Sequence, residues 1–153
     1  KLVDNDNLVQ ALVSGGNYTI DLLKSIQEAS GDYKYANDKW TIRQLVAHMI
    51  DAERVFAYRA LSFSRNDQNN LPGFEQNDWV DESNAENRKL YTLIAESTNV
   101  RASTTDLFSS FTTEMLARTG VASGHPVSVN ALGFIIAGHE IHHSNILKER
   151  YFS

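Results

Sequence analysis

Four of five consecutive residues near the end of the sequence carry side chains that can bind metals and transfer protons. The segment GHEIHHSNIL, residues 138–147, contains His139, Glu140, His142 and His143. Residues 139–143 fit the H-E-x-x-H pattern of zinc peptidases, in which two histidines bind the ion and the glutamate is the general base. Such peptidases take a third ligand from downstream, and only residues 144–153 follow here. We therefore look upstream for a third ligand and do not interpret Glu140 as a peptidase base.

The spacing of the three clustered histidines selects one pair. His139 and His143 stand at i and i+4, so both imidazoles lie on one face of a helix, one turn apart. Such a pair can bind one ion at about 2.0–2.1 Å. His142 lies about 100° around the helix from His143, although His139 and His142 at i and i+3 form a second possible pair. An exposed, metal-free cluster near a helix C-terminus is the alternative.

Four helical segments must position these side chains. Apolar residues recur at helical spacing over residues 5–29, 42–63, 83–111 and 128–151. Thr41 with Gln44, and Ser83 with Glu86, form capping-box signatures before the second and third segments, and Ser128 is an N-cap for the fourth. Adjacent glycines, Gly15-Gly16, mark a point where the first helix could bend.

The remaining segments predict connections. Residues 64–82 are polar, contain Pro72-Gly73 and show no sustained period, so we expect a long connection between helices two and three. Residues 118–127 are rich in turn formers and could hold a short extended piece. The expected fold class is all-α, a four-helix bundle in a single domain over residues 1–153, in which sites are built from side chains on facing helices.

On the second helix, three polar residues lie on or beside the apolar face. With Ile42 at 0°, His48 falls at about −120°, on the shoulder of the apolar arc, where an isolated histidine most often bonds a backbone carbonyl. Glu53 lies at about +20°, inside the arc, and we expect it to accept a hydrogen bond from an imidazole or to line a pocket. Arg59 is interpreted as a surface cation whose stem lies on the bundle.

Composition excludes several function classes. The net charge is −5 and no basic cluster is present, so we expect no nucleic-acid partner. No cysteine occurs, so a metal must be bound by imidazole and carboxylate, and any thiol must come from another molecule. The sequence shows no signal-peptide pattern at its start, and its longest apolar run is too short to span a bilayer. We expect a cytoplasmic protein without membrane partners.

Three stretches together resemble one known family. WTIRQLVAHMIDAERVFAYRAL at 40–61, LPGFEQNDW at 71–79 and GHEIHHSNILKERY at 138–151 resemble the DinB-like (DinB/YfiT) superfamily over nearly the whole sequence. The resemblance implies a four-helix bundle that binds a metal through one histidine of the second helix and an H-x-x-x-H pair of the last. These positions match His48, His139 and His143. It also implies the long connection after helix two.

The resemblance and the open coordination of a three-histidine site suggest chemistry on small molecules. Characterised family members look like thiol-dependent transferases and isomerases that use bacillithiol, mycothiol or glutathione. The sequence therefore predicts a divalent ion, zinc or nickel, and a low-molecular-weight thiol as cosubstrate of an S-transferase or isomerase. A metal-dependent hydrolase and a non-catalytic, metal-binding stress-response protein are the alternatives, and a homodimer is the oligomer that the family favours.

Overall fold

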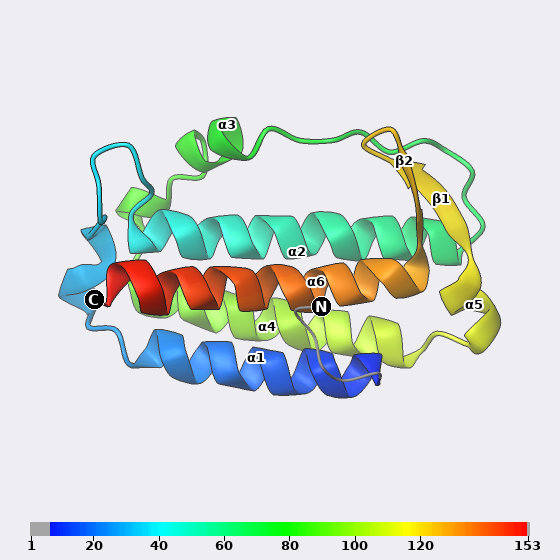
Figure 1. Cartoon of the computed structure of the whole chain (residues 1–153), viewed down its shortest axis with the longest axis horizontal. Helices are drawn as coiled ribbons and strands as arrows, with labels where there is room; N and C mark the ends of the chain where they lie inside the picture. Colours follow the sequence, from blue (N-terminus) through cyan, green and yellow to red (C-terminus); the bar gives the residue numbers. More distant parts are fainter. Residues whose placement is uncertain (1–6, 153) are drawn as a thin grey trace.

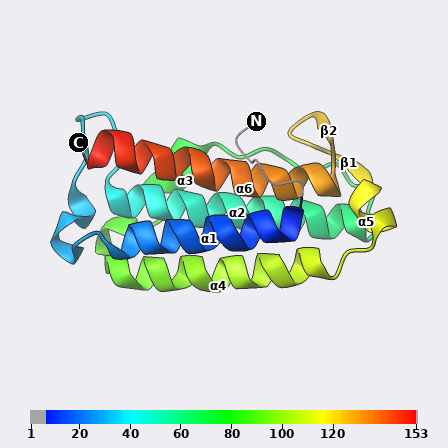
Figure 2. The same cartoon turned by 60° about the horizontal axis from the view of Figure 1, so that its bottom comes forward.

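The computed structural model describes residues 7–152, so the expected helix start at Asn5 lies outside them. Four long helices form a bundle, which is the all-α fold that the sequence predicts (Figure 1). They are α1 (Leu8–Lys24), α2 (Ile42–Ser64), α4 (Leu90–Ser109) and α6 (Val129–Ile146). Figure 2 shows all four aligned along the long axis of the molecule. No helix within residues 7–152 combines the length and hydropathy that crossing a membrane requires.

Short elements lie at the ends of the bundle and, in the case of α3, alongside α2. They are η1 (Glu28–Asp32), α3 (Gln76–Asp81), η2 (Ala85–Asn87), α5 (Thr113–Ala117), β1 (Thr119–Ala122), β2 (His125–Ser128) and a π-helical turn, η3 (Leu147–Tyr151). The first helix ends at Lys24, before the expected residue 29, and the chain continues into η1. Strands β1 and β2 pair as an antiparallel hairpin, where the sequence indicates a short extended piece.

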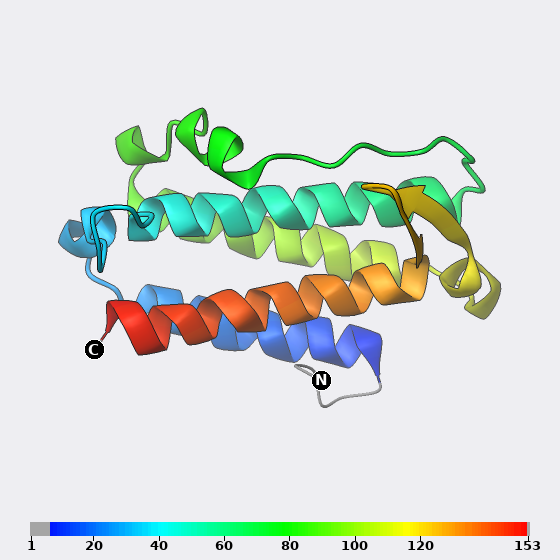
Figure 3. The same ribbon diagram turned by 45° about the horizontal axis from the view of Figure 1, so that its top comes forward.

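The long connection after α2 sets the topology. It runs back along α2, so that α4 starts at the same end as α2 and runs parallel to it (Figure 3). The sequence predicts no regular structure here, but α3 forms in the middle of the connection. Only Val80 of α3 is buried, and one buried residue in six gives no helical period to detect in the sequence. The hairpin fixes the other end of the connection, since Leu71 N–H donates to the Val121 carbonyl at 2.9 Å.

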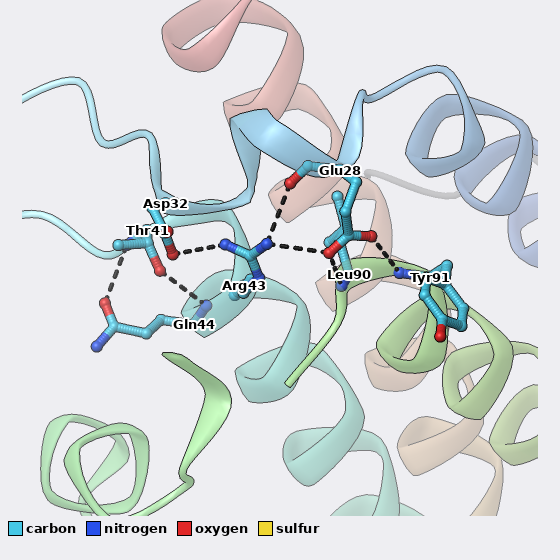
Figure 4. Close-up of polar contacts among 7 residues, drawn as sticks. All are labelled: Glu28, Asp32, Thr41, Arg43, Gln44, Leu90 and Tyr91. Atoms are coloured by element: carbon cyan, nitrogen blue, oxygen red, sulfur yellow. Dashed lines mark hydrogen bonds and ion pairs between the residues drawn. The ribbon is translucent and has the colours of Figure 1, made fainter. Parts of the chain in front are cut away.

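The N-terminus of α4 is capped from a distant part of the chain. Glu28 of η1 accepts hydrogen bonds from the backbone N–H groups of Leu90 at 2.6 Å and Tyr91 at 3.1 Å (Figure 4). The predicted capping box of Ser83 and Glu86 is therefore wrong, and α4 starts at Leu90. The Ser83 hydroxyl instead donates to a carbonyl three residues back. A carboxylate brought in by tertiary contacts satisfies the free N–H groups that a local cap would bind.

The other two predicted caps form. Thr41 and Gln44 make both hydrogen bonds of the capping box that opens α2, at 3.2 and 2.9 Å (Figure 4). Ser128 accepts from the Ala131 N–H at 3.0 Å and caps α6. Both elements that supply the clustered histidines and His48 thus begin where the sequence predicts.

A polar layer crosses the bundle between two apolar clusters. Arg101 of α4 donates to both carboxylate oxygens of Glu53 on α2, at 2.8 and 2.9 Å, and forms an ion pair with Glu140 on α6. Its Nη1 also donates to the Leu12 carbonyl of α1 at 2.9 Å. One buried guanidinium of α4 therefore contacts the other three helices of the bundle.

Gly16 gives this guanidinium its space. The helix α1 passes through Gly15 and Gly16 as one continuous helix. A Cβ on Gly16 would lie 2.9 Å from the Arg101 Cγ, whereas a Cβ on Gly15 would meet only Glu140 Oε2, at 3.6 Å. The paired glycines thus mark a close approach of a side chain at Gly16.

Candidate metal centre

Three histidines from two helices meet at one point between α2 and α6. The nitrogens of His48, His139 and His143 that could act as ligands all lie within 4.8 Å of one another, although 91 residues separate His48 from His139. Helix α2 places His48 and one face of α6 places the i, i+4 pair. Within residues 7–152, these three side chains form the complete group of candidate ligands at this point.

The spacing of the nitrogens fits a tetrahedral ion. His139 Nε2 lies 3.2 Å from His48 Nε2 and 3.1 Å from His143 Nε2. Ligands at about 2.0–2.1 Å from a tetrahedral ion lie roughly 3.3–3.4 Å apart, so both of these distances are close to those around a bound ion. Three imidazoles would leave at least one coordination position open to a small molecule.

Burial keeps these imidazoles neutral. Burial lowers the pKa of His48 to about 4. Burial, together with the nearby His48 and His142, lowers the pKa of His139 to about 4. Burial and the other histidines lower the pKa of His143 to about 3. A neutral imidazole has a free lone pair, which is the form that binds a metal.

Aromatic side chains and a cavity surround the three rings. The Trp40 ring lies 4.7 Å from the His48 ring, and the Phe56 ring lies 5.8 Å from His139. A cavity of about 290 Å³ reaches His143 and is also lined by Trp40 and by Asn77 of α3. The Nδ1 of His143 is buried and has no hydrogen-bond partner among the described residues. No acceptor among these residues therefore holds the imidazole proton on Nδ1. The Nε2 of His143 is directed at the His139 ring, 3.1 Å from that ring's Nε2.

The other candidate residues lie elsewhere. His142 is exposed and His125 lies exposed at the start of β2, so neither joins the cluster. Glu140 faces the polar layer and pairs with Arg101 rather than pointing at the cluster, which agrees with our rejection of a peptidase site. Burial raises the pKa of Glu140, and the Arg101 charge opposes that shift.

Glu53 also belongs to the polar layer. Both of its oxygens accept hydrogen bonds from Arg101, in place of the expected bond to an imidazole, because a buried cation faces it across the bundle. Sequence reasoning missed Arg101 because its neighbours on the helix are polar. The paired glycines of α1 were the available signal, since glycine in a helix interior permits close approach of another side chain.

The family is decided by a sequence comparison. Residues 11–147 match the model of the DinB superfamily. The chain belongs to this superfamily. No curated protein matches this DinB-superfamily sequence at a significant level.

Solved structures share the fold of this DinB-superfamily chain. YfiT from Bacillus subtilis, described as a probable metal-dependent hydrolase with an unusual four-helix bundle topology, is 19% identical with a TM-score of 0.76. That alignment covers 96% of this chain and 87% of YfiT. A DinB-like protein from Bacillus subtilis, YjoA, is 22% identical with a TM-score of 0.67, over 92% of this chain and 86% of that one.

A third structure is an enzyme with a larger chain. The mycothiol-dependent maleylpyruvate isomerase is 11% identical with a TM-score of 0.75, over 90% of this chain. The DinB-superfamily chain described here spans 58% of that isomerase. At these identities the three structures establish a common four-helix fold.

Proposed function

We propose that His48, His139 and His143 bind a divalent metal ion, zinc or nickel, and that the protein is a metal-dependent enzyme acting on small molecules. The convergence of three neutral imidazoles, with an open position left on the ion, is the observation that carries the proposal. A structural zinc site is instead closed by four protein ligands, and imidazole ligands suit both zinc and nickel.

The most favoured reaction is the transfer or isomerisation of a substrate with a small-molecule thiol. A bound divalent ion supplies Lewis-acid chemistry, lowering the pKa of a thiol or water placed beside it. The chain contains no cysteine, so the thiol comes from solution. The three histidines orient the ion, Trp40 shields the His48 ring, and the cavity beside His143 gives a small thiol room to approach.

The structural neighbours support two readings. Similarity to a mycothiol-dependent isomerase favours the thiol reaction, and similarity to YfiT, a probable metal-dependent hydrolase, supports hydrolysis as the second candidate. A non-catalytic metal-binding protein is the third. The three candidate functions differ in which molecule binds at the open coordination position of the metal. The absorption spectrum of a metal-substituted protein, recorded with and without thiol, therefore separates them.

Elemental analysis of untagged protein, purified without added metal, tests the site itself. We expect about one equivalent of zinc or nickel per chain, the number that one three-histidine site can hold. Protein that neither retains metal nor takes it up on dialysis would contradict all three readings.

Cobalt substitution tests the reaction class. Titrating small thiols into the cobalt protein should produce a sulfur-to-metal charge-transfer band, and the same thiols should be conjugated to a generic electrophile. His142→Ala is the matched control that should behave like the wild type, while His143→Ala should lose the band. Ester hydrolysis without any thiol response favours the hydrolase, and a silent but loaded site favours the non-catalytic protein.

A further inference from the structure

A second cavity lies between α2 and the long connection. It has a volume of about 370 Å³, within the range of small-molecule sites. Its walls are mostly apolar and are lined by Val55, Tyr58, Leu71, Phe74 and Trp79, with Arg59 among them. The Phe74 and Trp79 rings lie 4.7 Å apart, so the connection contributes a paired aromatic wall.

Arg59 is a buried cation without an anionic partner. It is 7% exposed, so its predicted position at the surface is wrong. Its Nη2 donates to the Pro72 carbonyl and to Ser123 Oγ, both at 3.0 Å, and its Nε is buried without a partner. Within residues 7–152, no carboxylate forms an ion pair with Arg59, and burial lowers its pKa. An unpaired buried charge is costly, so a ligand anion would relieve that cost.

The other charged residues of the cavity leave the Arg59 end positive. Arg54 is paired with Glu96 at 2.6 Å. Asp51 lies eight residues before Arg59, about 12 Å away along the helix axis. Burial raises the pKa of Asp51, and the nearby Arg54 opposes that shift. The cavity therefore presents an apolar body with one unneutralised cation at one end.

We propose that this cavity binds a small carboxylic acid with an apolar body the size of one aromatic ring, its carboxylate paired with Arg59. An Arg guanidinium matches the planar carboxylate and keeps its charge at any physiological pH. The Phe56 ring lies beside one residue of each site, with its centroid 5.8 Å from the His139 ring centroid and 5.7 Å from the Arg59 Cζ.

Calorimetry with a matched pair of probes tests the binding. Phenylacetate and phenylacetamide have the same shape and differ in charge. We expect phenylacetate to bind the full chain at least about tenfold more tightly, because only the acid carries a negative charge that pairs with the guanidinium. The affinity should be the same for zinc-loaded protein and after treatment with EDTA. Equal affinities, no binding, or binding of the acid only with zinc present would each overturn the proposal.

Three variants locate the carboxylate. Arg59→Gln should weaken phenylacetate binding about tenfold or more and leave phenylacetamide unchanged. Arg54→Gln, in the same cavity but already paired, is the matched control and should change the affinity less than about fivefold. Ser123→Ala removes one contact of Arg59 without removing its charge. If Ser123→Ala loses as much phenylacetate affinity as Arg59→Gln, the role of Arg59 is to hold the connection in place through hydrogen bonds. That result would contradict a ligand site.

The outcomes separate this inference from the proposed function. If Arg59→Gln does not fold, the ratio of phenylacetate to phenylacetamide affinity, measured in the wild type and in Arg54→Gln, still tests whether the cavity prefers a carboxylate. Metal retention without acid binding contradicts only the carboxylate site. Acid binding in a protein that takes up no metal contradicts only the metal centre.

Discussion

At the scale of single residues, adjacent histidines on α6 have opposite surroundings. His143 is buried in the cluster, while His142, one residue earlier, is exposed. The i, i+3 alternative therefore has no geometric support in the structure, because the His142 ring is outside the group of converging nitrogens. The two positions form a natural pair for comparison.

We expect His143→Ala to lose most of its bound metal and His142→Ala to keep it. Removing one ligand leaves two imidazoles, and loss of a ligand costs more than the 10- to 100-fold that loss of a supporting hydrogen bond costs. Metal per chain, measured after dialysis against a weak chelator, is the readout. Equal losses in both variants would return the i, i+3 pair as the ligand set.

Residue identity and helical angle identified the histidines but not the arginines. The wheel places His48 beside the apolar arc, and the family pattern selects it with the i, i+4 pair. The same wheel places Arg59 on the side of α2 that carries His48. A helical wheel contains no information on the long connection after α2, which covers Arg59 in the structure. Arg101 is likewise buried by three other helices. Such contacts between distant segments leave no local period in a sequence.

At the scale of elements, two neighbouring glycines of α1 differ in what they face. We predict that Gly16→Ala destabilises the protein, because its Cβ would meet the held stem of Arg101 at 2.9 Å. Gly15→Ala is the control and should stabilise by about 0.5–1 kcal/mol, since alanine is a better helix former and its Cβ has room. Urea unfolding of both variants measures the difference. Destabilisation by both, to the same extent, would contradict the special role of Gly16.

The cap on α4 predicts a pH dependence. The hydrogen bond from the Leu90 N–H lowers the pKa of the Glu28 carboxyl, burial opposes this shift, and the hydrogen bonds from Arg43 and Tyr91 add to it. Folding thus favours the charged form of Glu28. The charged carboxylate stabilises the folded protein above the unfolded pKa of about 4.3, and this stabilisation is lost as the pH falls through the lowered pKa of the folded state. Glu28→Gln should have a lower Tm at neutral pH, and the gap should close in acid. A gap independent of pH would show that the charge is unimportant.

Elements were predictable where their signals are local. The Thr41 capping box and the Ser128 cap involve residues three apart, and both form. Ser83 has the same signature and fails, because Glu28, more than sixty residues before α4, binds its N-terminus instead. The fold class followed from apolar periods, whereas the helix α3 and the cap on α4 depend on contacts across the bundle.

At the scale of the whole molecule, polar groups occupy the middle of the bundle. The apolar clusters fill the two ends, and the layer between them contains Arg101 with its two carboxylates and the hydrogen bond of Thr19 with Ser144 at 2.9 Å. Buried polar groups contribute less net stability than an apolar core of the same size, because their desolvation offsets their attraction. A metal that joins α2 to α6 would therefore add stability along the contact between these two helices.

We predict that removing the metal lowers the Tm of the protein. A ligand that binds only the folded state stabilises it by RT ln(1 + [L]/Kd), about 2.7 kcal/mol at a hundredfold excess over Kd, or roughly 5–10 °C for a domain of this length. The rise in Tm on adding zinc to EDTA-treated protein should be preserved in His142→Ala and absent in His48→Ala and His143→Ala, because each of the latter removes one of the three converging imidazoles. The His48→Ala result is decisive: α2 supplies that imidazole, and binding by α6 alone would stabilise a single helix without tying it to α2. A zinc-dependent rise that survives in His48→Ala would place the ion elsewhere and remove the link between the metal centre and the stability of the bundle.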